Sequence, residues 1–284
     1  MALALPSAAQ TGTGGRLMVH PTRLVLDDAL PRPGENPKSR GRSGEILLVN
    51  GGGERGTYRI SLMNMEMGED GGVREVPPRP GEVTAVNLIR FSPRQVTLEP
   101  ATTQTVRIQV RIPEGLAPGE YRCHMLFRAV PEPAPAKAPV SGEEAEEQGF
   151  SVRLIPIYGL TVPIIIRHGA TQVSASLSGL RLEAPAGTER PPALHLRLHR
   201  KGNKSVYGDL EATWSPKGGL SRAAGSRRGI AVYAKVAQRD LELALPDLPA
   251  GNRGPSTLKV RFLDHETKAV LSEAALEVAG TPTP

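Results

Sequence analysis

Few residues in this sequence have the types and spacing that catalysis or metal binding needs. The stretch HLRLH places His195 and His199 four positions apart, which is a metal-ligand spacing on a helix. Because leucines alternate with these histidines, the pattern instead predicts a strand whose two histidines face solvent. The single cysteine, Cys123, alternates with His124 in another strand-like stretch. We predict that Cys123 is a buried small hydrophobic residue and not a reactive thiol.

No catalytic constellation emerges from the rest of the sequence. It contains no G-x-S-x-G, no P-loop, no dinucleotide-binding fingerprint and no H-E-x-x-H. The acidic run EEAEE at 143–147 could attract a cation, but a solvated loop is the simpler interpretation. We therefore predict that the protein is not an enzyme and has no metal or cofactor, which leaves binding as the functional class.

The strand-like segment 150–168, FSVRLIPIYGLTVPIIIRH, is the strongest candidate for a binding element. It is long and apolar, and it contains Pro156 and Pro163. Since each proline would leave a gap in a central hydrogen-bond ladder, the segment is predicted to lie at a sheet edge. An exposed apolar edge favours pairing with another chain by β-strand addition. Alternatively, the prolines only protect an ordinary edge strand from aggregation.

The composition indicates many short strands joined by turns. The chain has 284 residues, of which 39% are hydrophobic, only 4% are aromatic, 31 are glycine and 27 are proline. Alternating strand patterns are found at 17–27, 45–51, 56–67, 104–112, 119–130, 150–168, 171–183, 193–200, 205–215, 228–236, 239–248, 256–265 and 269–278.

These strands predict two antiparallel β-sandwich domains in tandem, at 16–168 and 169–284. The joint, IRHGA at 166–170, is short, so a fixed angle between the domains is expected. The Pro-, Ala- and Glu-rich stretch at 131–149 is expected to be a flexible or extended loop.

Charge and hydropathy limit the partners. The net charge of +6 comes from basic residues that are scattered and interleaved with acids, so nucleic-acid binding is not expected. No apolar run of about 20 residues is present, so no membrane insertion is expected. Residues 1–15 begin with MALALPSAAQ, which resembles the end of a signal peptide without its basic region. Export is the favoured interpretation, and a flexible Ala-rich tail is the alternative.

Several segments, in order and spacing, resemble the periplasmic chaperones of chaperone/usher pilus assembly. In the first domain they are PTRLVLD (21–27), EILLVNGGGERGTYRISL (45–62), FSPRQVTLEPATTQTVRIQV (91–110), GEYRCHMLFRAVP (119–131) and YGLTVPIIIRHG (158–169). The second domain is similar in architecture and in NKSVYGDL (203–210) and LKVRFLDHETKAVL (258–271). The resemblance implies an all-β protein of two immunoglobulin-like domains in an L-shaped arrangement, without catalytic activity.

The resemblance also implies a mechanism, called donor-strand complementation. A pilus subunit of such systems is an immunoglobulin fold that lacks its last strand. The chaperone lends the last strand of its first domain until the next subunit replaces it at the outer-membrane usher. Backbone hydrogen bonds would give affinity and every second side chain specificity. The expected partners are fimbrial subunits and an usher in the periplasm; whether the free protein covers its edge by dimerising stays open.

Matching positions assign residues to this mechanism. Arg23, with Thr22 beside it, corresponds to the arginine that grips the subunit's C-terminal carboxylate, work that suits a bidentate guanidinium. A surface charge on a first strand is the alternative. The ungapped alignment gives a donor row, and a single bulge would select the opposite row. The two rows are Val152, Leu154, Pro156 and Tyr158, or Arg153, Ile155 and Ile157.

The interdomain ion network of the family maps onto Glu120, Arg167 and Asp264, where it would fix the angle between the domains. One departure concerns the second cleft cation of the family, a lysine, which lines up with Pro163. Either Arg23 acts alone, or a basic residue such as Arg153 or His168 contributes, or the client is not a standard pilin. The alternative function is a non-catalytic adaptor or structural protein that binds an envelope or surface partner.

Overall fold

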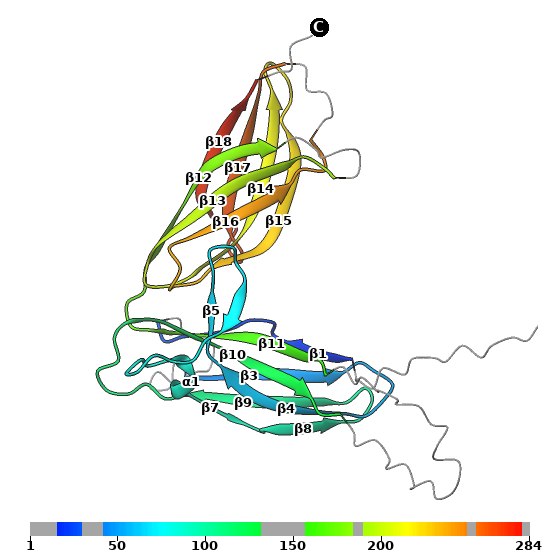
Figure 1. Cartoon of the computed structure of the whole chain (residues 1–284), viewed down its shortest axis with the longest axis vertical. Coiled ribbons are helices and arrows are strands. Elements are labelled where there is room, and N and C mark those ends of the chain that lie inside the picture. The colour runs from blue at the N-terminus through cyan, green and yellow to red at the C-terminus, as the bar shows by residue number, and fades with distance from the viewer. Residues whose placement is uncertain (1–15, 30–41, 132–156, 184–189, 249–253, 280–284) are drawn as a thin grey trace, which may run out of the picture. The chain divides into compact units, whose positions relative to one another are not determined.

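The computed structural model describes residues 16–29, 42–131, 157–183, 190–248 and 254–279 (Figure 1). Almost all of its regular structure in these ranges is β, apart from a short helix α1, Ala85–Leu88. The chain forms two compact units. The first comprises the chain up to Met63, Val83–Pro113 and Arg122–Ile166, and the second comprises Asn64–Glu82, Glu114–Tyr121 and the chain from Arg167 onward. The sequence patterns did not predict that residues 64–82 and 114–121 belong to the second unit.

The first unit is a sandwich of two antiparallel sheets. One sheet has the order β1-β3-β9-β7 and the other β2-β11-β10-β4-β8, so that successive strands cross between sheets as in immunoglobulin-like folds. The strands are β1 Leu17–His20, β2 Leu24–Asp27, β3 Ser43–Asn50, β4 Gly56–Met63, β7 Ile89–Ser92, β8 Gln95–Leu98, β9 Thr103–Val110, β10 Gly119–Ala129 and β11 Gly159–His168.

Alternation of side chains builds the core of this unit. In β9, Val106, Ile108 and Val110 are buried, whereas Arg107 and Gln109 between them are exposed. In β10 the buried row is Cys123, Met125 and Phe127. The prediction that Cys123 is buried is therefore confirmed, and burial raises the pKa of its thiol to about 12.

The strand that contains Pro163 does not lie at a sheet edge, so that prediction is wrong for β11. The strand lies between β2 and β10, and its second half is buried at Val162 and Ile164–Ile166. The prediction assumed that both neighbouring strands pair with β11 along its whole length, so that a proline would leave a gap in a hydrogen-bond ladder. Because β2 has only four residues against ten in β11, it covers only part of the strand, which leaves backbone positions where a proline is tolerated.

The second unit is also a two-sheet sandwich, with strand orders β12-β13-β16 and β15-β14-β17-β18. A β-hairpin from the middle of the sequence, β5 with β6, belongs to it as well. The core contains Trp214 and Phe262 and the buried leucines of β13. The strands are β5 Met65–Met67, β6 Val73–Glu75, β12 Val173–Glu183, β13 Ala193–Gly202, β14 Val206–Pro216, β15 Arg222–Val232, β16 Gln238–Ala244, β17 Ser256–Asp264 and β18 Val270–Val278.

The observed architecture confirms the predicted fold class: the protein is all-β, with two immunoglobulin-like sandwiches in tandem. Within the described residues, no helix is both long and apolar enough to cross a bilayer. The predicted signal remnant at 1–15 and almost all of the predicted loop at 131–149 lie outside the described residues.

Candidate partner-binding strand

The start of β11 exposes large apolar side chains. Tyr158, just before the strand, is 67% exposed, Ile157 is 45% exposed and Leu160 is 39% exposed. Side chains of a strand alternate, so Leu160 continues the row of Val162 and Ile164, which are buried. The same row therefore fills the core in the second half of the strand and faces solvent in the first half.

Neighbouring residues hold this exposed stretch in an extended position. The backbone amide of Ala129 donates a hydrogen bond to the carbonyl of Tyr158 at 3.0 Å, which pairs the stretch with the end of β10. At Gly159, a Cβ would lie 3.0 Å from Leu126 Cδ1, so the absent side chain lets the two strands approach. The apolar side chains are thus presented on a backbone that is already in strand conformation.

Most of the predicted donor residues lie outside the described residues: Val152, Arg153, Leu154, Ile155 and Pro156. The two that are described, Ile157 and Tyr158, come from opposite rows, and both are exposed. The choice between the two rows therefore stays a prediction.

Arg23 and Thr22 lie in the short connection between β1 and β2. Thr22 is exposed, Arg23 is partly buried, and Leu24, where β2 begins, is buried. Since β2 is a neighbour of β11 in the sheet, Arg23 directly precedes a strand that borders the candidate binding strand. Its role as a carboxylate anchor stays a prediction.

Glu120 and Arg167 form an ion pair within the second unit. Arg167 Nε lies 3.3 Å from Glu120 Oε2, and the side chain of Glu120 is almost completely buried. The same oxygen accepts hydrogen bonds from the backbone amide of Ser205 at 3.0 Å and from its hydroxyl at 2.8 Å. The other oxygen, Oε1, is buried and accepts no hydrogen bond from the described residues. A buried pair that is only partly hydrogen-bonded contributes little net stability.

Asp264, the third residue of the predicted network, has contacts in its own turn. Asp264 Oδ1 accepts hydrogen bonds from the amides of Glu266 and Thr267, at 3.1 and 2.8 Å, and from the Thr267 hydroxyl. It therefore closes the turn after β17. An aspartate followed by turn residues satisfies its carboxylate locally, and the part of Asp264 in the family network stays a prediction. Sequence analysis did not identify Ser205 as a partner of Glu120, because a single serine in KGNKSVYG matches no motif.

A second buried carboxylate, Asp209 of β14, was also missed. It accepts hydrogen bonds from Lys268 Nζ at 2.6 Å, His265 Nδ1 at 2.8 Å and the Gly229 amide at 2.9 Å. Burial alone would raise the pKa of Asp209, but these hydrogen bonds outweigh it and hold the pKa well below the usual 3.8. The cluster joins β14 to β15 and to the turn after β17.

The histidines that suggested a metal site have other partners. His195 Nε2 lies 2.9 Å from Glu183 Oε2, and His199 Nε2 lies 2.7 Å from the hydroxyl of Ser178. Both belong to strand β13, as predicted, between buried leucines. Among the described residues, no group of three His, Cys, Asp or Glu side chains could hold a metal ion.

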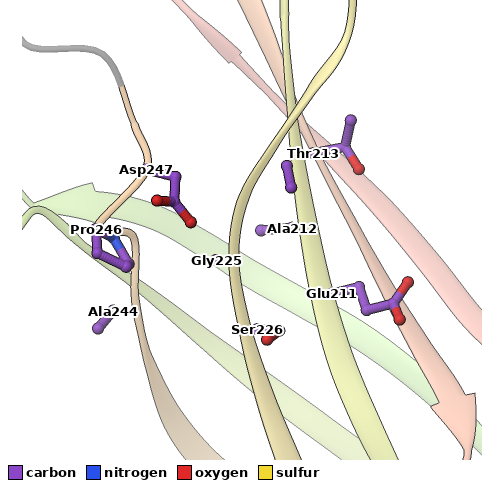
Figure 2. A pocket seen from close by; sticks show the side chains of 9 residues that line it. Glu211, Ala212, Thr213, Gly225, Ser226, Ala244, Pro246 and Asp247 are labelled. Atoms are coloured by element: carbon purple, nitrogen blue, oxygen red, sulfur yellow. The ribbon is translucent and has the colours of Figure 1, made fainter.

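A cavity of about 510 Å³ opens on the second unit between β14, β15 and the segment after β16. Figure 2 shows Pro246 and Asp247 on one side and Glu211 and Thr213 on the other, with Gly225 between them. Small side chains leave this space empty, and Glu211 is already bound to Arg261 at 3.1 Å. The cavity contains none of the predicted site residues.

Comparison with known proteins gave only structural likeness. No family model and no curated protein matches the sequence. Among solved structures, the chain is similar to the class 5 fimbriae chaperone CfaA, with 13% identity, a TM-score of 0.41 and coverage of 94% of this chain and 100% of that one. It is also similar to the Pseudomonas aeruginosa chaperone CupB2 (11%, TM-score 0.41, coverage 92% and 100%) and to the E. coli chaperone DraB (14%, TM-score 0.40, coverage 93% and 97%). At this level of similarity, no functional residue is transferred.

Proposed function

We propose that this protein is a periplasmic chaperone that binds pilus subunits through the first half of β11 and passes them to an outer-membrane usher. One observation carries the proposal: the row of side chains that fills the core of the first unit continues into solvent at Leu160 and Tyr158. The sequence resemblance to chaperone/usher chaperones supports the same function.

The backbone at the start of β11 suits strand addition. One side pairs with β10, through the hydrogen bond between Ala129 and Tyr158. On the other side the neighbour is β2, whose four residues cannot cover all of a ten-residue strand. A partner strand can therefore add to the uncovered part, with backbone hydrogen bonds for affinity and the exposed apolar side chains for specificity.

The proposed anchor for the subunit is Arg23, assisted by Thr22. A guanidinium stays charged at every physiological pH and can bind a C-terminal carboxylate in bidentate fashion. Pro163 stands where the family has a second cation, so in this proposal Arg23 supplies most of the anchoring charge. The Glu120–Arg167 pair lies within the second unit, and its role in fixing the angle between the domains stays a prediction.

Co-expression with a small β-rich protein encoded next to an usher tests the proposal. We expect Leu160→Asp and Arg23→Ala each to reduce recovery of the soluble complex at least tenfold, since a charge in an apolar groove or the loss of a bidentate pair costs roughly 1.4 kcal/mol or more. The controls are Leu220→Asp, at an 82% exposed leucine of the second unit, and Arg107→Ala, on the outer face of β9. Equal recovery with all four variants would contradict donor-strand binding and would favour the adaptor function.

A further inference from the structure

Residues 64–82 leave the first unit and return to it. The chain exits the first unit after Met63, forms the β5–β6 hairpin as part of the second unit, and re-enters the first unit at Val83. The hairpin has strands of only three residues, Met65–Met67 and Val73–Glu75. An isolated two-stranded hairpin is at best marginally stable in water, so the order of this one depends on what it contacts. We call residues 64–82 the strap.

An ion-pair cluster at Lys235 holds the two ends of the strap. Lys235 Nζ lies 3.1 Å from Glu66 Oε1 on β5 and also binds Glu82, the last residue of the strap. Both carboxylates are mostly buried, whereas the lysine is half exposed. The hydrogen bond from Lys235 lowers the pKa of Glu82, as does a second hydrogen bond from the Arg79 amide. Lys235 thus holds Glu66 and Glu82, which lie near opposite ends of the strap, at one place on the second unit.

The tip of the strap rests on strand β16. The amide of Asp240 donates to the carbonyl of Glu69 at 2.9 Å, and Gln238 Nε2 donates to the Glu69 carboxylate at 3.1 Å. Gly71, at φ +82°, packs so closely on Arg239 that a Cβ there would lie 2.1 Å from the Arg239 Nε atom. Since β16 is the last strand of its sheet, the strap covers part of an edge that would otherwise be open.

Polar contacts join the strap to strand β16 and to the residues just before it. Met67 packs against the core of the second unit, and hydrogen bonds and ion pairs join the strap to the short segment 235–240. Exposed ion pairs and single hydrogen bonds contribute little each, and regions with few buried apolar contacts open at lower free energy than the core. The buried residues of the large apolar core of the second unit all lie outside the strap.

We propose that residues 64–82 form a strap, latched by Lys235, which opens and closes on the edge of β16 while the rest of the second unit stays folded. Opening breaks the ion pairs of Lys235 with Glu66 and Glu82 within the second unit. It also frees the amide of Asp240 at the edge of β16. This proposal does not depend on the identity of any client.

Amide hydrogen exchange of the full-length protein tests the strap. The reporting amides are Gly68 and Val76, whose hydrogen bonds lie within the strap, and Asp240, whose bond joins it to β16. The amides of β17, an inner strand of the opposite sheet, report opening of the whole unit. We expect the strap amides to exchange faster than those of β17 in the unaltered protein. Equal rates would overturn the proposal, because the strap would then open only on global unfolding.

Two pairs of variants separate the latch from general destabilisation. Lys235→Ala should accelerate exchange of the strap amides about threefold and leave β17 unchanged. Lys259→Ala, which removes the same charge and an ion pair with Glu273 at 2.7 Å, should leave the strap unchanged. If the two variants accelerate exchange of the strap amides equally, the proposal that Lys235 latches the strap is wrong.

The second pair tests the contact between the tip of the strap and Arg239. Gly71 and Gly81 both have positive φ, but a Cβ at Gly81 would meet no atom within 4 Å. Gly71→Ala and Gly81→Ala therefore carry the same backbone strain, and only the first adds a clash with Arg239. We expect exchange of the Asp240 amide to be about tenfold faster in Gly71→Ala than in Gly81→Ala. Equal exchange in the two variants would show that the strap does not rest on Arg239.

Discussion

The last strands of the two units, β11 and β18, both expose apolar residues at their start but differ in the charged residues that accompany them. β18 lies at a sheet edge and begins with the exposed residues Val270 and Leu271. Beyond them it carries Glu273 and Glu277, which bind Lys259 and Thr257 on β17. β11 exposes apolar residues at its start and has no charged residue before Arg167. The charges of β18 are suited to protecting an edge from pairing, whereas the exposed start of β11 has no such charges. The proposed binding function of β11 rests on this difference.

The two units also bury different titratable groups. In the first, His124 of β10 is buried, and burial together with the Arg122 charge lowers its pKa to about 4. In the second, Asp209 is buried as a carboxylate. The chain supplies a separate probe for each unit: the single cysteine, Cys123, is buried in the first, and the single tryptophan, Trp214, is buried in the second.

The largest expected effect is on the buried half of β11. Ile164 is completely buried, so Ile164→Ala should destabilise the first unit by about 2 to 5 kcal/mol. Leu276 of β18 is only partly buried, so Leu276→Ala should destabilise the second unit by roughly half as much. Thiol labelling of Cys123 and fluorescence of Trp214 in a denaturant series measure the two effects. Equal losses would mean that the two last strands are packed alike.

Weak acid should destabilise the first unit before the second. Since the folded state favours neutral His124, the unfolded chain binds the proton more tightly. The stability of the first unit should therefore fall as the pH drops from about 6.5 to about 4, by about 3 kcal/mol in total. His124→Gln should flatten this dependence in Cys123 labelling. A slope that persists in the variant would assign the acid sensitivity to another group.

A smaller loss is expected from Asp209→Asn in the second unit. The amide keeps the shape but weakens three hydrogen bonds to a charged acceptor, at a cost of about 2 kcal/mol near neutral pH. Because the folded state lowers the pKa of Asp209, its contribution is present at neutral pH and is lost as the pH falls below about 4. The Trp214 transitions of the variant and the unaltered protein should thus converge at low pH. A constant difference down to the most acidic sample would contradict this assignment.

The smallest change in stability is expected from Glu273→Val on β18. An exposed ion pair contributes less than about 0.5 kcal/mol, so the Trp214 transition should scarcely move. If the charges of β18 protect its edge, the variant should nevertheless self-associate at lower protein concentration, as measured by sedimentation. Glu99→Val, which makes the same change outside any strand, is the control. Equal self-association of the two variants would contradict the claim that the charges of β18 protect its edge.

The sequence predicted the longer strands and the two sandwiches because alternation over eight or more residues is a strong signal. It missed β6, β7, β8 and helix α1, which have four residues or fewer and therefore show almost no periodicity. It also merged β4 and β5 into one strand at 56–67. The edge position assigned to Pro163 was wrong because a neighbour as short as β2 is not visible in the pattern of β11. Sequence spacing carries no information on the length of a partner strand.

The site residues were predictable only in part. Glu120 and Arg167 do meet, and Ser205, which no sequence signal indicated, binds the same carboxylate oxygen. The Asp209 cluster draws on three segments that are distant in sequence, and no local motif connects them. Long-range polar contacts depend on register and burial, which single-sequence patterns specify poorly.

Site-specific photo-crosslinking tests the central claim most directly. A photoreactive residue replaces Tyr158 at the start of β11 or Val270 at the start of β18, two positions that are both more than half exposed. Each variant is then co-expressed with a small β-rich protein encoded next to an usher. The proposed function predicts strong crosslinks to that protein from position 158 and few from position 270. Equal crosslinking from both positions, or none from position 158, would contradict the assignment of β11 as the binding strand.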